Sequence, residues 1–236
     1  MPGKSSLTSI VTDAPPVRDL AVAGRLQPPE LTGKIHELKY SAMSSVLIIF
    51  VKNPVLGKVK TRLAKVLGHE AAVKIYQKLL KHTCMITTGI FADKYVFYSE
   101  YINHRDLWKS DVFKKELQYG NDLGGRMKNA FEILFQRGYR EVVIIGSDCY
   151  ELTEEIIMNA FIQLKQNDVV IGPAKDGGYY LLGMNTFTPQ LFDGKSWSTN
   201  KVFLETLAEI KSLNYSICTL PELNDVDTPG DVNFTY

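Results

Sequence analysis

The sequence has few cysteines, no long apolar run and almost no net charge. Its three cysteines, Cys84, Cys149 and Cys218, lie far apart and lack CxxC spacing, which argues against a disulfide framework and against a zinc site. The longest apolar run, residues 46–51, is much shorter than the roughly 20 residues that span a bilayer. The first residues also lack the continuous apolar stretch of a secretion signal. We therefore expect a protein of the reducing cytoplasm without a membrane partner.

Positive and negative charges are balanced. Twenty-seven Lys and Arg face 26 Asp and Glu, which leaves a net charge of +1. No basic stripe with interleaved aromatic residues is present, so we expect no nucleic-acid partner. Any function that depends on charge must therefore use local clusters of charged residues. The sequence does not indicate an oligomeric state.

The first 43 residues differ from the rest of the chain. They contain five of the ten prolines and show no sustained helix or strand period. We expect residues 1–43 to be an N-terminal extension or leader, with Met43 as an alternative start. Residues 44–236 are long enough and apolar enough to form one folded domain.

From Ser45 onward, short apolar runs alternate with amphipathic stretches. The pattern predicts strands at 46–51, 94–98, 141–145, 168–171, 179–182 and 215–220. It predicts helices around 71–80, 123–136, 154–164 and 199–211. Such alternation is typical of an α/β fold in which a largely parallel sheet lies between helices. Because open parallel sheets bind ligands beyond the carboxyl ends of their strands, functional residues are expected just after the strands.

The first polar cluster, KNPVLGKVKTRL, directly follows the first strand. It gathers four cations around Gly57, namely Lys52, Lys58, Lys60 and Arg62. Cations and inward-pointing backbone amides suit a phosphate chain, although the spacing is neither that of a Walker A loop nor that of a GxGxxG turn. The alternative is a solvated basic turn.

The second cluster is QYGNDLGGRM, at the start of a predicted helix. Gly120, Gly124 and Gly125 permit close approach of the backbone to a ligand. Asp122 and Arg126 are four residues apart and could pair across one helical turn. A glycine-rich helix entry with an internal ion pair is therefore the alternative to a binding loop.

The third cluster, GSDCY, follows the apolar run of residues 142–145. Asp148 at the end of a buried strand is a natural ligand for Mg²⁺ or Mn²⁺, and such an ion would bridge phosphate oxygens. Capping of the next helix is the alternative, but Thr153 is already placed to serve as that cap. No histidine lies near Cys149 in the sequence, so we expect a buried structural cysteine and not a nucleophile.

The fourth cluster combines DGGYY with DVDTPGD. Asp176 precedes two glycines that leave space for a substrate, and the tyrosines after them offer stacking or packing. Asp225 and Asp227 alternate and share one face of an extended chain, so either could be a second metal ligand. An Asp-rich turn in which Thr228 and Asp231 cap a short helix is the alternative.

Taken jointly, the motifs resemble a known bacterial family. KNPVLGKVKTRLA, QYGNDLGGRM, IIGSDCYELT, IGPAKDGGYYLLG, SWST and DVDTPGD look like the GT-A-fold glycosyltransferases of the radical-SAM and selenodomain-associated transferase group. The resemblance covers nearly all of residues 45–231, with the motifs in order. It implies a three-layer α/β/α, Rossmann-like GT-A fold of the nucleotide-diphospho-sugar transferase type, with a mostly parallel central sheet.

The resemblance also implies roles for individual residues. Gly57, Lys60 and Arg62 would contact the nucleotide phosphates, and Asp148 with Asp227 would hold Mg²⁺ or Mn²⁺. Further nucleotide contacts are expected from Lys52, Lys58, Gly120 and Arg126, and substrate contacts from Gly177, Gly178, Tyr179 and Trp197. The base that deprotonates the acceptor is expected to be Asp176 or Asp122, with Asp176 favoured because of the glycines beside it.

Two positions depart from the family pattern. Tyr150 stands where proline is usual, and Gly125 stands where an acid is usual. Both departures concern the acceptor side and the geometry between Asp122 and Arg126.

Three functions are compatible with these motifs. The first is a metal-dependent glycosyltransferase that uses a nucleotide-diphospho-sugar donor and a small-molecule acceptor. The second is a nucleotidylyltransferase that releases pyrophosphate, because KTRL is similar to the phosphate loop of guanylyltransferases acting on phospholactate. The third is a catalytically inactive nucleotide-binding module, suggested by the two departures.

Overall fold

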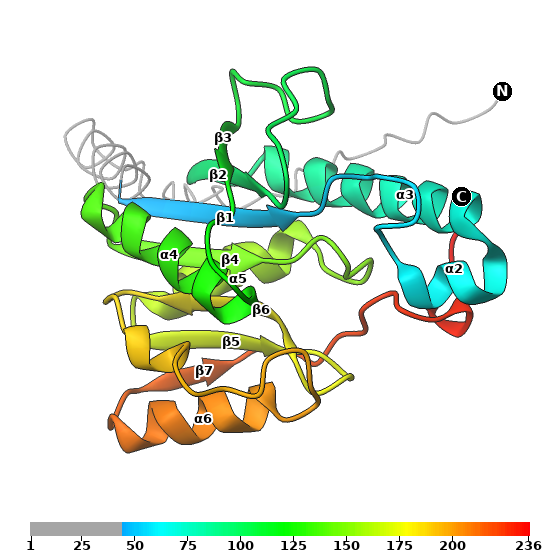
Figure 1. The fold of residues 1–236 in the computed structure, drawn as a ribbon. Helices are drawn as coiled ribbons and strands as arrows, with labels where there is room; N and C mark the ends of the chain where they lie inside the picture. Colours follow the sequence, from blue (N-terminus) through cyan, green and yellow to red (C-terminus); the bar gives the residue numbers. More distant parts are fainter. Residues whose placement is uncertain (1–43) are drawn as a thin grey trace, which may run out of the picture. The chain divides into compact units, whose positions relative to one another are not determined.

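The computed structural model describes residues 44–236 (Figure 1), so the expected extension and Met43 lie outside the described residues. The strands are β1 Ser45–Val51, β2 Asp93–Tyr98, β3 Lys114–Leu117, β4 Glu141–Ile145, β5 Val169–Pro173, β6 Tyr179–Met184 and β7 Ile217–Thr219. The α-helices are α2 Thr61–Leu67, α3 His69–Thr88, α4 Leu123–Gln136, α5 Glu154–Leu164 and α6 Val202–Ser212. Two 3₁₀ helices, η1 Pro189–Leu191 and η2 Pro229–Asp231, complete the described elements.

The seven strands form one sheet in the order β3-β2-β1-β4-β6-β5-β7. Strand β6 runs antiparallel to β4 and β5, and the other pairs are parallel. Residues 174–178 connect β5 to β6, and a turn this short allows only an antiparallel hairpin, because a parallel crossover needs a dozen or more residues. The prediction of a mostly parallel central sheet is confirmed.

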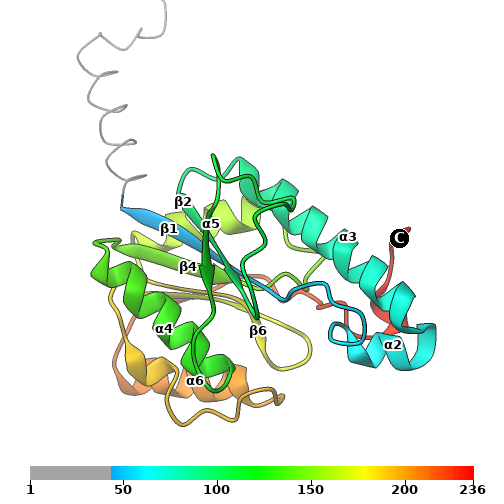
Figure 2. The same cartoon turned by 45° about the horizontal axis from the view of Figure 1, so that its top comes forward.

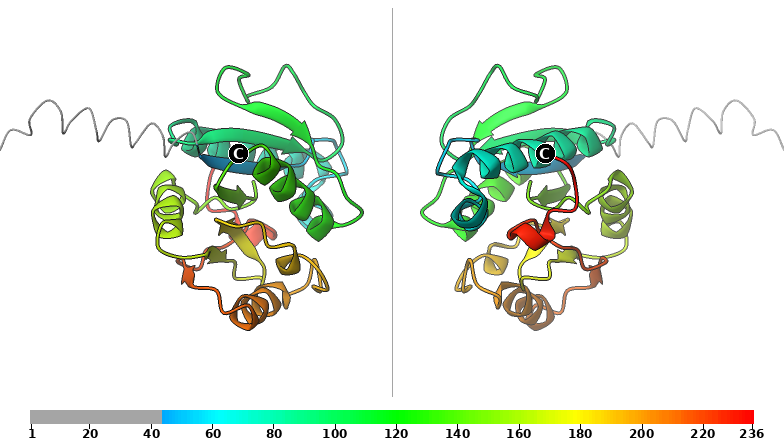
Figure 3. Two further views of the ribbon diagram at one scale, coloured as in Figure 1. Left: turned by 90° about the vertical axis from the view of Figure 1, so that its left-hand side faces the viewer. Right: turned by 90° about the vertical axis from the view of Figure 1, so that its right-hand side faces the viewer.

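Helices cover both faces of the sheet and make the expected three layers. The core on one face joins Leu47 and Ile49 of β1 to residues of α3 and α5. The core on the other face joins Ile48 of β1 to α4 and, through Ile210, to α6. Figures 2 and 3 show α4 and α5 on opposite sides of the sheet. Because both faces of β1 are covered, its sequence is continuously apolar and not alternating.

Most predicted strands and helices are present with shifts at their ends. Strand β3 was not predicted, because its sequence KKEL has no apolar run; charged residues are typical of a strand at a sheet edge. Among the helices of residues 44–236, none combines the length and apolar character that a membrane crossing requires.

Side chains cap the two helices that follow the polar clusters. Thr153 accepts a hydrogen bond from the Ile156 amide at 3.4 Å at the start of α5, as predicted. Asp122 accepts one from the Gly125 amide at 2.7 Å at the start of α4. The ion pair between Asp122 and Arg126, which the sequence offers as an alternative to a binding loop, is not formed: the carboxylate caps α4, and the arginine Nε donates to the Gly120 carbonyl at 3.1 Å.

Candidate functional site

A cavity of about 570 Å³ lies beyond the carboxyl ends of β1 and β4. Most of its lining comes from five segments: the end of β1 and the loop after it with the start of α2, the end of β4 and the segment after it, the turn before β6 with the start of that strand, residues 197–202 and residues 225–227. Tyr76 of α3 and Leu123 and Met127 of α4 complete it. This is the edge of the sheet at which the sequence predicts a ligand site.

A short antiparallel bridge brings two of these segments together. Cys149 pairs with Asp225, and the Val226 amide donates to the Asp148 carbonyl at 2.9 Å. The chain after β4 therefore runs beside the C-terminal segment. This pairing places Asp148 and Asp227 at one point of the cavity wall.

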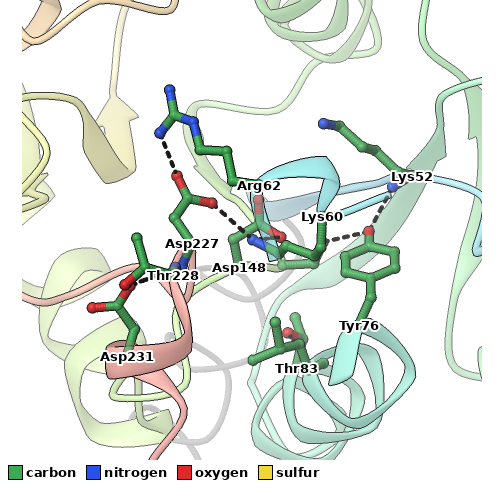
Figure 4. A network of polar contacts seen from close by, with 11 residues as sticks. Lys52, Lys60, Arg62, Tyr76, Thr83, Asp148, Asp227, Thr228 and Asp231 are labelled. Carbon is green, nitrogen blue, oxygen red and sulfur yellow. Dashed lines mark hydrogen bonds and ion pairs between the residues drawn. The ribbon is translucent and has the colours of Figure 1, made fainter. Parts of the chain in front are cut away.

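Lys60 lies between these two carboxylates (Figure 4). Its Nζ is 3.0 Å from Asp148 Oδ1 and 3.3 Å from Asp227 Oδ1, and Arg62 Nη1 is 3.2 Å from the other oxygen of Asp227. The Lys60 side chain is only 5% exposed. Burial lowers its pKa, but the two carboxylates outweigh burial and raise the pKa above the ordinary value. The ammonium group therefore keeps its charge.

The Lys60 backbone is in the left-handed region, with φ 46° and ψ 48°. Residues other than glycine rarely adopt this conformation. Those that do are often found at functional sites, where the surrounding structure keeps them in it. Here it ends the loop after β1 and begins α2. The turn directs the lysine toward the carboxylates.

Asp225 is the third carboxylate of this wall. Burial, and next the negative charge of Asp148, raise its pKa to about 7, and Lys60 partly opposes this effect. The spacing of Asp225 and Asp227 does not decide which of them joins Asp148, whereas the family resemblance implies Asp227. The structure places Asp227 against the cations and Asp225 deeper in the wall.

Asp231 holds Asp227 in place. Its carboxylate accepts hydrogen bonds from the Thr228 amide and hydroxyl, both at 2.7 Å, and from the Asp227 amide at 3.2 Å. Thr228 and Asp231 form the capping box of η2, which is the alternative that the sequence offers for this turn. The cap thus fixes the backbone that carries the candidate metal ligand.

Tyr76 of α3 connects the β1 loop to the segment after β4 (Figure 4). Its hydroxyl accepts from the Lys52 amide at 2.8 Å and lies 2.9 Å from Ser147 Oγ. Sequence reasoning missed this role, because Tyr76 occupies an apolar position of a helix and carries no motif. Within residues 44–236, Lys52 Nζ has no hydrogen bond or ion pair with another side chain, so this cation is available to a ligand.

Asp176 occupies the turn between β5 and β6. One of its oxygens, Oδ1, accepts from the Gly178 amide at 2.8 Å, and the side chain lines the cavity. The expectation that both glycines open space is wrong for Gly177. Its φ is +86°, and a Cβ there would lie 2.2 Å from the Asn200 carbonyl oxygen, so this glycine lets Asn200 approach the turn.

The predicted residues divide into two groups. Those that line the cavity are Asp176, Lys52, Lys58, Lys60, Arg62, Asp148, Asp227, Gly178, Tyr179 and Trp197. Those that lie outside the lining are Asp122, Gly57, Gly120, Arg126 and Gly177. Lys58 is also paired with Glu100 at 2.9 Å. Sequence reasoning missed lining residues without a distinctive motif, namely Phe50, Tyr76, Leu123, Met127 and residues 198–200.

The sequence departure at Tyr150 has a structural role away from the cavity lining. Its ring centroid lies 4.5 Å from that of His82 and 4.1 Å from that of Phe234, so it packs α3 against the C-terminal segment. The neighbouring Cys149 is 4% exposed. Burial, and next Asp225, raise the pKa of its thiol to about 12, which agrees with a structural cysteine.

The carboxylates fit a divalent ion that is shared with a ligand. Among residues 44–236, no group of three His, Cys, Asp or Glu side chains forms a complete metal site. Asp148 and Asp227 nevertheless converge on one point, at the ammonium of Lys60. Mg²⁺ is commonly held by one or two carboxylates together with substrate phosphates, and this donor set matches that arrangement.

The chain is similar to proteins of known structure. A family model described as "Uncharacterized protein conserved in bacteria (DUF2064)" matches residues 85–199. A "putative nucleotide-diphospho-sugar transferase" from Desulfovibrio desulfuricans G20 is 36% identical, with a TM-score of 0.75 over 81% of this chain and 85% of that one. None of the curated proteins matches the chain.

Two more distant structures share the fold alone. The inositol-1-phosphate CTP transferase from T. maritima is 14% identical, with a TM-score of 0.51 over 81% of this chain and 92% of that one. The 4-diphosphocytidyl-2C-methyl-D-erythritolsynthase from Anaerococcus prevotii DSM 20548 is 10% identical, with a TM-score of 0.51 over 80% of this chain and 95% of that one. The chain therefore belongs to the DUF2064 family of bacterial proteins, with the fold of the nucleotide-diphospho-sugar transferases.

Proposed function

We propose that this protein is a metal-dependent glycosyltransferase that uses a nucleotide-diphospho-sugar donor. The observation that carries the proposal is the convergence of Lys60 and Arg62 with Asp148 and Asp227 on one wall of the cavity. The name of the 36% identical relative, "putative nucleotide-diphospho-sugar transferase", supports the same class of donor. The cations would bind the diphosphate, and the carboxylates would hold Mg²⁺ or Mn²⁺.

The donor half of the reaction follows from charge. As the sugar leaves, negative charge builds on the diphosphate oxygens, and Lys60 and Arg62 would stabilise it there. Lys60 must then exchange its aspartate partners for phosphate oxygens. When bound at Asp148 and Asp227, the divalent ion would supply Lewis-acid stabilisation of the same leaving group. Lys52, which has no ion partner in the described part of the chain, adds a further cation to this loop.

The acceptor half requires a base. An acceptor hydroxyl oxygen forms a bond to the anomeric carbon while the bond from that carbon to the diphosphate oxygen breaks, and the diphosphate leaves with the electron pair. The acceptor proton passes to Asp176, which is exposed and lines the cavity. Asp122 is less suited to this role, because its carboxylate caps α4 and lies outside the lining.

Ligand-induced changes in the thermal midpoint test the donor site. Wild type, Asp148→Ala and Asp193→Ala are compared with nucleoside triphosphates, nucleoside diphosphates and sugar nucleotides, each with and without Mn²⁺. A ligand at 100 times its dissociation constant should stabilise the fold by about 2.7 kcal/mol. We expect a metal-dependent shift with a sugar nucleotide that Asp148→Ala loses. Asp193→Ala should retain it, because this exposed aspartate pairs with Lys128 outside the cavity lining.

The released product then identifies the reaction. Transfer from a sugar nucleotide releases a nucleoside diphosphate, whereas nucleotidyl transfer from a triphosphate releases pyrophosphate. We expect nucleoside diphosphate, and Asp176→Asn should slow its release about 100-fold or more. Pyrophosphate as the product would replace the proposal with nucleotidyl transfer. Nucleotide binding without any product would indicate an inactive binding module.

A further inference from the structure

The cavity opens where β1 and β4 part. The two strands pair in parallel as far as Ile49 and Ile145. Beyond that pair, β1 connects through α2 and α3 to β2 on one side, and β4 connects through α5 to β5 on the other side. Neighbouring strands that connect in opposite directions leave a crevice between the segments that follow them, which is the usual position of a ligand in an open α/β sheet. Here the crevice separates the loop of residues 52–60, which we call the cation loop, from the segment that carries Asp148.

Tyr76 of α3 joins the two sides of this crevice. The residue is 1% exposed, and its hydroxyl accepts from the Lys52 amide at 2.8 Å (Figure 4). The same hydroxyl lies 2.9 Å from Oγ of Ser147, which is 5% exposed. Because the phenol oxygen accepts from Lys52, its proton is available to Ser147. One buried side chain therefore connects the first residue of the cation loop to the residue directly before Asp148.

These hydrogen bonds differ from the ion pair that also crosses the crevice. The Lys60 ammonium lies 3.0 Å from Asp148. Both partners of this ion pair are expected to contact the ligand, so the pair must separate when phosphate and metal bind. Tyr76 uses a backbone amide and the hydroxyl of Ser147, which the ligand proposed above does not need. Its hydrogen bonds can therefore persist with and without ligand and hold the spacing of the two sides.

We propose that Tyr76 is a positioning residue that couples nucleotide binding to metal binding, because its hydroxyl holds the cation loop at the distance from Asp148 that a diphosphate and its ion require. The inference rests on the metal-dependent use of a nucleotide proposed above. The cations of the loop hold the phosphates, and the ion must meet Asp148 and the phosphate oxygens at once. A loop held by Tyr76 is ordered before the ligands arrive, whereas a loose loop must lose conformational freedom on binding. Tyr76 therefore acts on the gain in nucleotide affinity that Mg²⁺ provides.

Nucleotide affinity with and without metal tests this coupling. Calorimetry measures the dissociation constants of UDP, GDP, CDP, ADP and dTDP in EDTA and in Mg²⁺, and the ratio of the two constants is the metal enhancement. We expect Tyr76→Phe to keep the EDTA affinity of wild type and to lose about tenfold or more of the enhancement, as is usual when a residue that supports a metal site is removed. Thr83→Val is the control, since it removes a buried hydroxyl of the same helix whose hydrogen bond, to the Leu79 carbonyl at 2.9 Å, stays within α3. It should keep the whole enhancement.

The outcomes separate this coupling from a merely structural role. A wild-type enhancement in Tyr76→Phe, or equal losses of affinity in EDTA and in Mg²⁺, would overturn the inference and leave the proposed donor site standing. If wild type binds none of the five diphosphates, or binds them equally with and without Mg²⁺, the proposed function itself fails.

Ser147→Ala tests the path through the hydroxyl, and it decides the question if Tyr76→Phe does not fold. This variant keeps the hydrogen bond between Lys52 and Tyr76 and removes the contact on the side of Asp148. We expect its enhancement to fall, and the double variant with Tyr76→Phe to lose no more than Tyr76→Phe alone, because the effects of residues that act through one contact do not add. Losses that multiply in the double variant, or an unchanged enhancement in Ser147→Ala, would overturn the assignment.

Discussion

The ammonium group of Lys60 lies 3.0 Å from the carboxylate of Asp148, at the point where the sequence predicts a divalent ion. A side chain of the protein itself therefore offsets the charge of Asp148 and Asp227. Lys60 and a divalent ion compete for the same oxygens. This competition leads to the first prediction.

Lys60→Met should make the site bind Mg²⁺ more tightly without nucleotide. In EDTA, the variant should lose about 1–3 kcal/mol of unfolding free energy, because Asp148 and Asp227 lose a buried partner. Added Mg²⁺ should raise its thermal midpoint more than that of wild type. Arg62→Met is the control, since Arg62 is 72% exposed and its loss should cost less than about 1 kcal/mol. Equal Mg²⁺ shifts in wild type and Lys60→Met would contradict the competition.

Asp225 should make stability depend on pH. Its pKa rises from 3.8 to about 7 on folding, because of burial and the charges of Asp148, Asp176 and Asp227, with Lys60 acting in the opposite direction. The folded protein therefore holds a proton that the unfolded chain releases, and the unfolding free energy should fall as the pH rises from about 4 to about 7. Asp225→Asn should remove a decline on the order of 2–4 kcal/mol over this window. Urea unfolding in EDTA at several pH values measures the unfolding free energy of wild type and of Asp225→Asn. If the two free energies depend on pH in the same way, the prediction is wrong.

Gly124→Ala should displace Trp197. The new methyl group would lie 2.1 Å from the indole ring, closer than any real contact, so the ring or α4 must shift. We expect a loss of about 1–3 kcal/mol from overpacking and weaker substrate binding. Gly125→Ala is the matched control: its Cβ would lie 3.3 Å from Asp122 Oδ1, and the helix gains about 0.5–1 kcal/mol from the replaced glycine. Equal denaturant midpoints for the two variants would argue against the close packing of Trp197.

Asn53→Ala should loosen the loop that carries the cations. Asn53 is 3% exposed, and its side chain accepts from the Glu100 and Tyr101 amides and donates to the Tyr101 carbonyl at 2.9 Å. Without it, these backbone groups lose their partner at a cost of about 1–3 kcal/mol. Asn103→Ala, which removes an exposed local hydrogen bond to the Arg105 amide, should change stability by less than about 0.5 kcal/mol. Denaturant unfolding measures the loss of stability, and nucleotide affinity measures the loosening of the loop. If Asn53→Ala binds nucleotide as tightly as wild type, Asn53 does not position the cations of this loop.

Local patterns predict the parts of the fold and site that depend on neighbouring residues. The buried strands follow from apolar runs, the Thr153 cap from its position, and the location of the cavity from the rule for parallel sheets. The burial pattern of β6 does not reveal its antiparallel direction, because its residues are as buried as those of the parallel strands; only the short connection of residues 174–178 indicates it.

Long-range contacts explain what sequence patterns do not predict. The sequence pattern predicts only that Tyr76 is a core residue of a helix. Its hydrogen bond to the Lys52 amide depends on the packing of α3 beside the end of β1. Asp122 and Arg126 have the spacing of an ion pair, but the free amide at the start of α4 competes for the carboxylate. The sequence predicts that Lys60 contacts phosphate, but it does not predict the long-range bridge between Cys149 and Asp225 that brings the lysine against Asp148.

The distances along the chain between site residues have a consequence for folding. Asp176 and Gly178 lie in one hairpin turn and can reach their final arrangement locally, whereas Lys60 and Asp227 are 167 positions apart. Contacts over such separations must first overcome the entropy of closing long loops, so hairpins form much faster than these contacts. The ion pairs of Lys60 with Asp148 and Asp227 are therefore expected to form among the last contacts of the domain. Nucleotide binding during refolding should consequently report completion of the whole sheet and not formation of the hairpin that carries the base.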